Sequence, residues 1–493
     1  MKANSLSVVT ALLIILLLAT PSMAWQGRMA GMGDANGLIE DESDYLIHPA
    51  TIAAGSGLNF YGNYRLTYNK TTKWDYSISS PALSVTYPFS TSGHSWKNEG
   101  QLGAAFTLGA GRMGVFFDYT GINGNYSGDQ SYTGFWYNGY ATYDFSNKIN
   151  DFALKVIYGL PVQTMKLGAE FQMVYRNEEQ ETNWRDAGNF FKNYLWSAED
   201  YLENNLNPFM IPYQSKYWEA QGKVSVAGSM GPAKYAFTLK GGIPFASDNK
   251  FDRVGSLSYT IEGKVKGFKA GGDFWLRVPL YDRMVLPFVV SAGYKTIKRD
   301  GVFNAQLPWI VTYEHETKDI FVKVGGGVDF TPANGTKVAA GLYYDFIRTN
   351  QNLHASDTNL PTFYVDEYTD MPKYTEHRLT LKTLAEKELS SMIILRGGFN
   401  VFYGMVKSDY AYSAYDNFGP FSPFNMSTSG SNVGVNVSAG ATVRLDKVSL
   451  EPFINAGYVK YKTSGDGTVG LFATEAEFNK DDWLIGGGLS VKF

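Results

Sequence analysis

The sequence predicts an all-β fold, a transmembrane antiparallel β-barrel of 14–16 strands, with 16 favoured. The first observation is composition, because 52 Gly, 34 Tyr and 32 Phe accompany only 18% charged residues. The second is a strict period of two in many segments of 10–14 residues, long enough for a tilted strand to cross a bilayer. The third is a last alternating segment that ends at Phe493.

Residues 1–24 are predicted to be a cleaved signal peptide. Lys2 gives a positive start, residues 6–19 are mostly apolar, and small residues precede a cleavage point after Ala24. The apolar run is too short to span about 30 Å of hydrocarbon. No other stretch approaches 18 consecutive apolar residues. An exported chain without membrane helices is therefore expected in a bacterial envelope.

Residues 58–493 are predicted to form the barrel. Tight turns alternate with long loops, which is the asymmetry of outer-membrane barrels, and an even number of strands places both termini on the periplasmic side. The segment 74–88 is a further strand or an extension of the first hairpin. The predicted strands are 58–69, 99–108, 112–120, 149–160, 164–177, 216–229, 233–243, 267–279, 284–297, 319–330, 335–348, 374–384, 391–404, 432–445, 447–461 and 482–493.

The last predicted strand indicates the compartment. Its alternating apolar residues run to the C-terminal aromatic Phe493, which looks like the signal that barrel-insertion machinery reads. We therefore expect a bacterial outer-membrane protein in contact with outer-membrane lipid. Six tyrosines near strand ends fit interfacial aromatic girdles: Tyr64, Tyr119, Tyr158, Tyr175, Tyr294 and Tyr458.

The polar faces of the strands are expected to line the lumen. Basic residues outnumber acids there by 13 to 7, which would favour anions or a carboxylate-bearing ligand. The alternative, which we favour, is that opposite charges pair across neighbouring strands. The lumenal charges singled out are Arg65, Lys166, Glu170, Arg277, Arg396 and Arg444.

Residues 25–57 precede the first strand and are predicted to form a hatch or plug. A Gly-x-Gly-x-Ala element, an acidic stretch and a Pro-Ala pair follow one another there. The segment resembles the N-terminus of the FadL-type (FadL/TodX and PorV-like) outer-membrane transporters, although His48 stands where that family has asparagine. The resemblance implies a hatch inside the barrel and a side opening for hydrophobic substrates; the family's barrels have fourteen strands. The hatch residues are Gly31, Gly33, Asp41, Asp44, His48, Pro49 and Ala50.

Residues 186–206 are predicted to be a helix in an outer loop, because apolar residues recur there at spacings of three and four. The resemblance implies that such a helix shapes a groove for hydrophobic ligand. The alternative is a lid helix that packs its stripe on other loops. The candidate ligand-binding residues are Phe190, Phe191, Tyr194, Leu195, Ala198 and Leu202.

No catalytic, metal or cofactor site is predicted. The absence of cysteine excludes thiolate chemistry and disulfides, and a net charge of -4 gives no case for nucleic acid. A Gly109-x-Gly111-x-x-Gly114 match leads into a strand rather than a helix, so it is rejected as a dinucleotide site. His315 and His377 lie beside glutamates, but no partnering nucleophile is identifiable, so no enzyme is expected.

The function expected is passive uptake of hydrophobic or amphipathic small molecules, fatty-acid-like in kind, through a hatch-gated barrel. One alternative is a porin-like channel through which small polar or anionic solutes diffuse. Another is a barrel that acts as partner or sheath in an envelope complex.

Overall fold

The computed structural model describes residues 26–32, 37–80, 85–133, 138–186, 213–253, 259–304, 310–359, 364–370, 373–416, 419–446, 448–469 and 472–493. Strands make up most of this chain: β1 (Asn59–Ser80), β2 (Val85–Leu108), β3 (Gly111–Thr133), β4 (Asn138–Val162), β5 (Met165–Asp186), β6 (Tyr213–Met230), β7 (Ala233–Arg253), β8 (Tyr259–Tyr281), β9 (Met284–Asn304), β10 (Ile310–Ala333), β11 (Thr336–Asn359), β12 (Tyr364–Asp370), β13 (Lys373–Glu388), β14 (Ile393–Asp416), β15 (Gly419–Leu445), β16 (Val448–Val469) and β17 (Phe472–Lys492). Short helices precede them: α2 (Gln26–Gly31), η1 (Glu42–Leu46) and η2 (Pro49–Ala54). The predicted signal peptide and the predicted helix after Asp186 lie outside the described residues.

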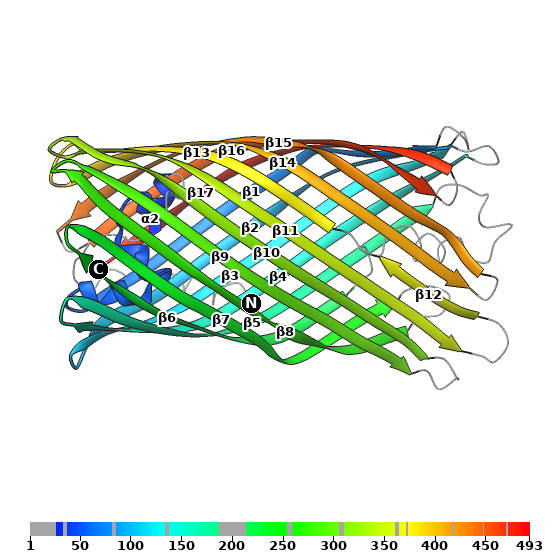
Figure 1. The fold of residues 1–493 in the computed structure, drawn as a ribbon, viewed down its shortest axis with the longest axis horizontal. Coiled ribbons are helices and arrows are strands. Elements are labelled where there is room, and N and C mark those ends of the chain that lie inside the picture. The colour runs from blue at the N-terminus through cyan, green and yellow to red at the C-terminus, as the bar shows by residue number, and fades with distance from the viewer. Residues whose placement is uncertain are drawn as a thin grey trace, which may run out of the picture.

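The strands form one closed antiparallel barrel (Figure 1). Apart from β12 and β13, each strand pairs with its neighbours in sequence, and β1 pairs with both β2 and β17, which closes the ring. Both β12 and β13 pair with β11 and β14, so these two strands share one position in the wall. The seventeen described strands therefore occupy sixteen positions. The predicted all-β barrel and the favoured count of 16 are confirmed.

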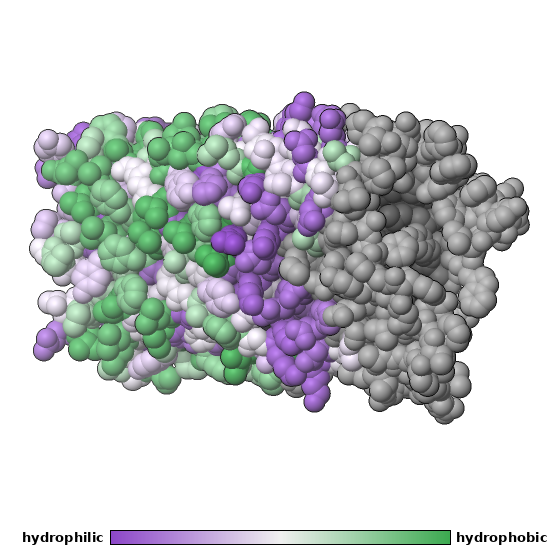
Figure 2. Space-filling view, turned by 45° about the vertical axis from the view of Figure 1, so that its right-hand side comes forward, coloured by the Kyte–Doolittle hydropathy of each residue, from purple (hydrophilic) through white to green (hydrophobic). Residues whose placement is uncertain are grey.

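Alternation divides each strand into an outer and an inner face. On β5, Met165, Leu167 and Phe171 are 41–53% exposed, whereas Glu170 between them is only 5% exposed. Because successive side chains point to opposite faces of a strand, the apolar set faces outward and the charged set faces the lumen. Figure 2 shows the result as a broad apolar belt on the outside of the half of the barrel that carries the short turns.

The outer edge of this belt is marked by pairs of rings on neighbouring strands, which we call the outer girdle. Tyr175 lies ten residues beyond Met165, where β5 begins, and Tyr458 lies ten residues beyond Val448, where β16 begins. About 9–11 residues of a tilted strand cross a bilayer, so these rings mark the outer membrane–water interface. The pairs are Tyr68–Trp96, Tyr119–Phe152, Tyr175–Trp218, Phe268–Tyr294, Tyr344–His377 and Tyr458–Trp483.

The strands continue well past the girdle, which corrects the predicted strand lengths. The 10–14 residues expected become, for example, 22 in β1 and 27 in β15. Most of the segment 74–88 belongs to β1 and β2, as one of the two alternatives proposed. Above the girdle the outer face carries polar residues such as Lys70 and Lys460, so the hydrophobic alternation fades there while the hydrogen-bond ladder continues. Figure 2 shows a hydrophilic band there.

The other end of the barrel has short turns and both described ends of the chain. Gly109, Gly231 and Gly335 have positive φ angles in these turns, which glycine adopts without steric cost. Phe493 exchanges two 3.1 Å backbone hydrogen bonds with Phe60 and is itself buried. In outer-membrane barrels the short turns face the periplasm, so this is the periplasmic end. Within the described residues, no helix is long and apolar enough to cross a membrane.

Candidate functional site

The N-terminal segment, here the described residues 26–32 and 37–57, lies inside the barrel near its periplasmic end (Figure 1). Its three short helices face different parts of the wall: α2 contacts β14–β17, and η2 contacts β3–β6. Between them, residues of the segment reach the remaining strands through the contacts described below. The wall provides small, charged and aromatic side chains as partners at this level.

A row of small side chains supports the end of the segment. Gly159, Gly168, Ser225 and Thr238 are direct partners on β4, β5, β6 and β7, and all face the lumen. The backbone N–H of Ala50 donates a 2.6 Å hydrogen bond to the Ser225 hydroxyl. A Cβ added at Gly168 would lie 2.1 Å from the same nitrogen. Only glycine at this position leaves room for the backbone of the segment.

His48 lies at the end of this row. Its Nδ1 is 2.8 Å from the Thr238 hydroxyl, and its ring meets Trp275 edge-on at 6.1 Å between centroids. Burial lowers the pKa of His48 to about 4, so the ring is neutral at physiological pH. A neutral imidazole can donate from one nitrogen and accept at the other, which suits a buried contact to a hydroxyl. His48 therefore seats the segment here as a neutral hydrogen-bonding side chain.

Apolar contacts hold η1 and η2 against the adjoining part of the wall, β1–β4. Tyr45 stacks on Phe116 at 5.7 Å and meets Tyr61 at 6.3 Å between centroids. Ile52 joins this cluster, which also contains Ala105 of β2. Each of these side chains is less than 5% exposed, so the cluster is a dry core inside the lumen rather than a wet channel surface.

The start of the segment is fixed by a second apolar cluster. Met29, Met32, Leu38 and Ile39 are buried against Ala339 and Leu384. Leu38 occupies space that Gly327 and Gly341 leave open, since a Cβ at either would come within 2.8 Å of it. Gly37 of the segment in turn leaves space for Val289 of β9, because a Cβ at Gly37 would lie 2.9 Å from a methyl carbon of Val289.

Ion pairs join this part of the segment to the wall. Arg28 of α2 contacts Asp41 and Glu386 of β13, both at 2.9 Å. Glu386 also accepts a 2.8 Å hydrogen bond from Arg396. Arg28 and Glu386 are only partly buried, and Glu386 keeps Arg396 as a partner, so the loss of Arg28 would cost less than the roughly 3–5 kcal/mol that is typical of a fully buried ion pair. Arg28 is thus a polar attachment of the segment.

Arg277 of β8 makes a further attachment. It donates to the Leu38 carbonyl at 3.1 Å and pairs with Asp329 at 2.5 Å, and its side chain is 7% exposed. Lys223 of β6 contacts the Leu46 carbonyl at 2.5 Å and pairs with Glu170 at 3.1 Å. The segment therefore has contacts with strands all round the ring.

Asp41 and Asp44 form the acidic corner of the segment. The Asp41 N–H donates to the Asp44 carboxylate at 3.1 Å, and both side chains are buried. Burial, reinforced by the charge of Asp41, raises the pKa of Asp44 to about 8, although Arg277 opposes the shift. Asp44 is therefore protonated at neutral pH while the segment is seated.

This pKa shift predicts that alkaline pH loosens the segment. The pKa of Asp44 in the seated segment lies above the value of about 4 expected for a free chain. Its contribution to seating is complete below about pH 4 and is lost as pH rises through about 8. Limited proteolysis of residues 26–57 is expected to accelerate between pH 6 and pH 9. Asp44→Asn should remove most of that pH dependence, and an unchanged profile in this variant would contradict the assignment.

The predicted hatch residues are placed as follows. Asp41, Asp44, His48, Pro49 and Ala50 all lie in the seated segment and are buried. Gly31 ends α2, and Gly33 lies outside the described residues. The six candidate ligand-binding residues of the outer loop, Phe190, Phe191, Tyr194, Leu195, Ala198 and Leu202, also lie outside the described residues.

The lumenal charges pair with one another. Across the strands, Lys155 meets Asp118 at 2.9 Å, Lys240 meets Asp273 at 2.7 Å, and Arg396 meets Glu451 at 3.3 Å. Arg65 lies 4.0 Å from Glu99, Arg444 lies 3.9 Å from Glu388 at the periplasmic end, and Lys166 faces the lumen on β5. This is the pairing alternative, so the basic excess does not make the wall a uniform anion surface.

Several attachment residues were not predicted from sequence. Arg28, Glu386, Ser225, Thr238 and Trp275 all contact the segment, yet none belongs to a recognisable motif. The feature that could have identified Ser225 and Thr238 is their alignment with other small residues on the lumenal face of adjacent strands. This alignment can be seen only when the register of the strands is known.

The described residues contain no group of three or more His, Asp or Glu side chains arranged to hold a metal ion. His377, one of the two histidines considered for catalysis, lies on the outer face in the girdle, where its ring contacts the Tyr344 hydroxyl at 2.6 Å. His315 lies within β10.

A closed barrel with an apolar outer belt and an aromatic girdle defines an outer-membrane β-barrel protein. No family model and no curated protein matches this chain. Among solved structures, the chain is similar to the P. putida toluene transporter TodX (11% identity, 95% of this chain and 98% of that chain, TM-score 0.37). It is also similar to a Pseudomonas aeruginosa FadL homologue (11%, 96% and 99%, 0.44) and to the Ralstonia pickettii toluene transporter TbuX (10%, 96% and 99%, 0.34).

Proposed function

We propose that this protein is an outer-membrane channel for the passive uptake of hydrophobic or amphipathic small molecules, fatty-acid-like in kind. Two features support the proposal together. The N-terminal segment lies in the lumen at the periplasmic end, and further along the barrel the backbone pairing of β7 with β8 is interrupted. The interruption is the observation that carries the proposal, because a hydrophobic molecule needs a route between lumen and lipid that a polar solute does not.

The interruption lies between β7 and β8. The two strands pair regularly up to Gly242↔Lys269 and resume only at Asn249↔Gly263. From Gly242 to Asn249 β7 advances seven residues, whereas from Lys269 to Gly263 β8 advances six, so β7 carries one extra residue. The same extra residue is seen on the other side of β7, where Lys216↔Asp248 is followed by Trp218↔Phe245. Among the seams between described strands, this is the longest break in pairing.

The break opens at the outer edge of the apolar belt. Ile243 and Phe245 at its start are 56% and 39% exposed on the outer face. Phe245 is the direct partner of Trp218, and Phe268 borders the break on β8, so both flanks belong to or adjoin the outer girdle. A molecule that passed here would move between the lumen and the outer leaflet of the membrane.

The break and the seated segment share one strand. Thr238, which contacts His48, lies only four residues before Gly242 on β7. Below the break, Lys269 of β8 reaches across Gly242 to Glu219 of β6, with 2.6 Å between Nζ and a carboxylate oxygen. Movement of the segment would therefore act on the same strand whose pairing fails above it.

Deleting Ala246 tests this route. Removing one residue from the bulge makes the steps of β7 equal to those of both neighbours, so regular pairing can continue on both sides. We expect uptake of a labelled long-chain fatty acid by cells that depend on this protein to fall at least about tenfold, a barrier of about 1.4 kcal/mol. Deleting Thr72 is the matched control, since it removes a one-residue bulge from β1 on another part of the wall. Equal uptake in both deletion variants and the wild type would refute the lateral route.

The same cells distinguish the alternatives. A porin-like channel would admit small polar or anionic solutes at a rate that deletion of Ala246 leaves unchanged. A barrel that serves as an envelope partner would take up neither the fatty acid nor the polar solutes, and it would purify with a second protein. The paired charges of the lumen give the anion channel no specific support.

A further inference from the structure

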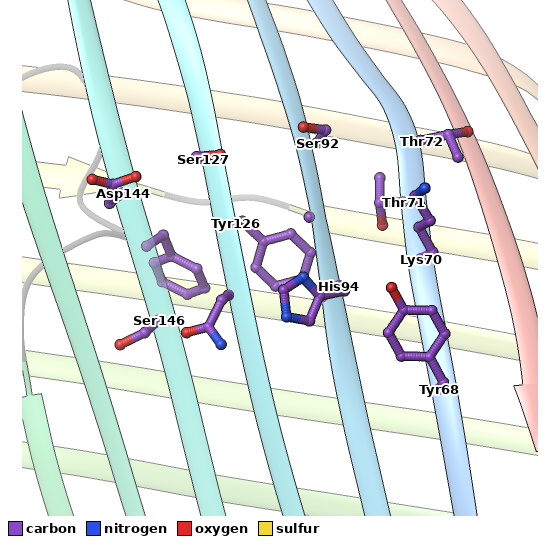
Figure 3. Close-up of a pocket in the computed structure, with 13 residues that line it drawn as sticks. Tyr68, Lys70, Thr71, Thr72, Ser92, His94, Tyr126, Ser127, Asp144 and Ser146 are labelled. Carbon is purple, nitrogen blue, oxygen red and sulfur yellow. The ribbon is translucent and has the colours of Figure 1, made fainter.

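A groove of about 800 Å³ lies on the barrel wall over β1–β4, away from the lumenal segment (Figure 3). Its lining includes Lys70 on β1, His94 on β2, Asn125 on β3 and Ser146 on β4. These four residues form one directly paired row, Lys70↔His94↔Asn125↔Ser146. Tyr64 on β1 and Trp96 on β2 are exposed on the outer face. Lys70 and His94 lie an even number of residues from them on the same strands, so the row also lies on the outer face.

The groove begins where the apolar belt ends. Tyr68, which also lines it, stacks against Trp96 at 4.4 Å between ring centroids and forms one pair of the outer girdle. Lys70 and Thr72 follow Tyr68 by two and four residues, toward the outside of the cell. A groove at this height faces neither lipid chains nor bulk water. It faces the layer of lipid headgroups beside the barrel.

The lining chemistry suits a sugar that carries an anionic group. Ser92, Ser127, Asn125 and Asp144 offer hydroxyl, amide and carboxylate groups that can bond to sugar hydroxyls. The rings of Tyr68 and His94, 6.0 Å apart, offer apolar faces beside these polar groups. Lys70 is exposed and makes no ion pair within the part of the chain that the structure describes, so its ammonium can contact a phosphate.

We propose that this groove binds the phosphorylated sugar headgroup of an outer-leaflet glycolipid. Lys70 contacts the phosphate, and the row of hydroxyl and amide side chains contacts the sugars. The site is separate from the lumenal route, so it anchors the barrel in its leaflet rather than transporting cargo.

The test uses the full chain purified in detergent and measures bound glycolipid by native mass spectrometry. The probes are lipopolysaccharide with inner-core sugars, lipid A without those sugars, and inorganic phosphate as competitor. Lys70→Ala is expected to weaken glycolipid binding about fivefold, the effect of losing one surface cation beside an anionic headgroup. Lys460→Ala is the matched control: Lys460 is exposed and lies two residues past Tyr458 of the girdle, as Lys70 lies two past Tyr68, but it does not line the groove.

A second variant, Asn125→Leu with Ser127→Leu, fills the groove without removing the cation. It should reduce binding of the core-bearing glycolipid at least tenfold while barrel folding, read from unchanged β-sheet circular dichroism, is retained. The proposal is overturned if Lys70→Ala and Lys460→Ala lower binding equally, or if the filled groove binds as well as the wild type. It is also overturned if millimolar phosphate alone displaces the glycolipid completely, because the ligand would then be a free anion.

Discussion

Gly168→Val is expected to unseat the N-terminal segment while leaving the barrel intact. The added Cβ would lie 2.1 Å from the Ala50 nitrogen and 2.5 Å from its Cα, so the new side chain collides with backbone that no rotamer change can move. Overpacking of this kind costs about 1–3 kcal/mol. A cost of about 2 kcal/mol shifts the equilibrium between seated and displaced segment by roughly thirtyfold.

The measurement is limited proteolysis of residues 26–57 together with ion conductance in planar bilayers, both of which should rise. Gly222→Val is the control, because it puts the same side chain on the neighbouring strand where the added Cβ meets only the Glu170 carbonyl at 3.7 Å. If Gly168→Val is as protected and as poorly conducting as Gly222→Val, the segment is not held by this row.

Removal of residues 25–50 is expected to have a larger effect. The wall would lose the plug contacts of α2, η1 and the start of η2, including Arg28 with Glu386 and Tyr45 with Phe116. Because the hydrogen-bond ladder of the strands closes the barrel without them, insertion into the membrane should persist. The lumen should then conduct ions steadily, and fatty-acid uptake should change.

Heat-resistant migration on a gel without boiling checks that the deletion variant still folds. A folded variant with wild-type conductance and wild-type uptake would show that the segment does not control passage. A variant that fails to insert would instead assign the segment a role in assembly, and Gly168→Val then decides between the two because it removes no residues.

The strands could be predicted well where apolar and polar residues alternate and less well where they do not. Segments such as 164–177 and 432–445 carry apolar residues every second position because one face meets lipid, and their strands are present. In β1, residues 69–73 are polar on both faces, so the predicted strand stops at residue 69. Trp74, Tyr76 and Ile78 then resume the alternation, which is why segment 74–88 could be predicted as a further strand or an extension of the first hairpin. These strands continue because backbone hydrogen bonds between neighbouring strands do not depend on an alternation of apolar side chains.

The site was predictable only in part. Asp41, Asp44, His48, Pro49 and Ala50 were predicted as hatch residues through the resemblance of the N-terminal segment to a known family, and all five are buried in the lumen. Their partners Gly159, Gly168, Ser225 and Thr238 come from four strands and line up only through the register of the sheet. The extra residue in β7 is likewise invisible in one strand alone, because a bulge exists only relative to its neighbours.

The most direct test of the account compares two solutes in the same cells. Bacteria without their own fatty-acid channel would express the wild-type chain, and entry of a labelled long-chain fatty acid and of a labelled disaccharide would be measured side by side. The account predicts faster entry of the fatty acid and unchanged entry of the disaccharide, since we propose that the N-terminal segment blocks the lumen and that the interrupted pairing of β7 and β8 gives a route to lipid. Faster entry of the disaccharide with no gain for the fatty acid would contradict it.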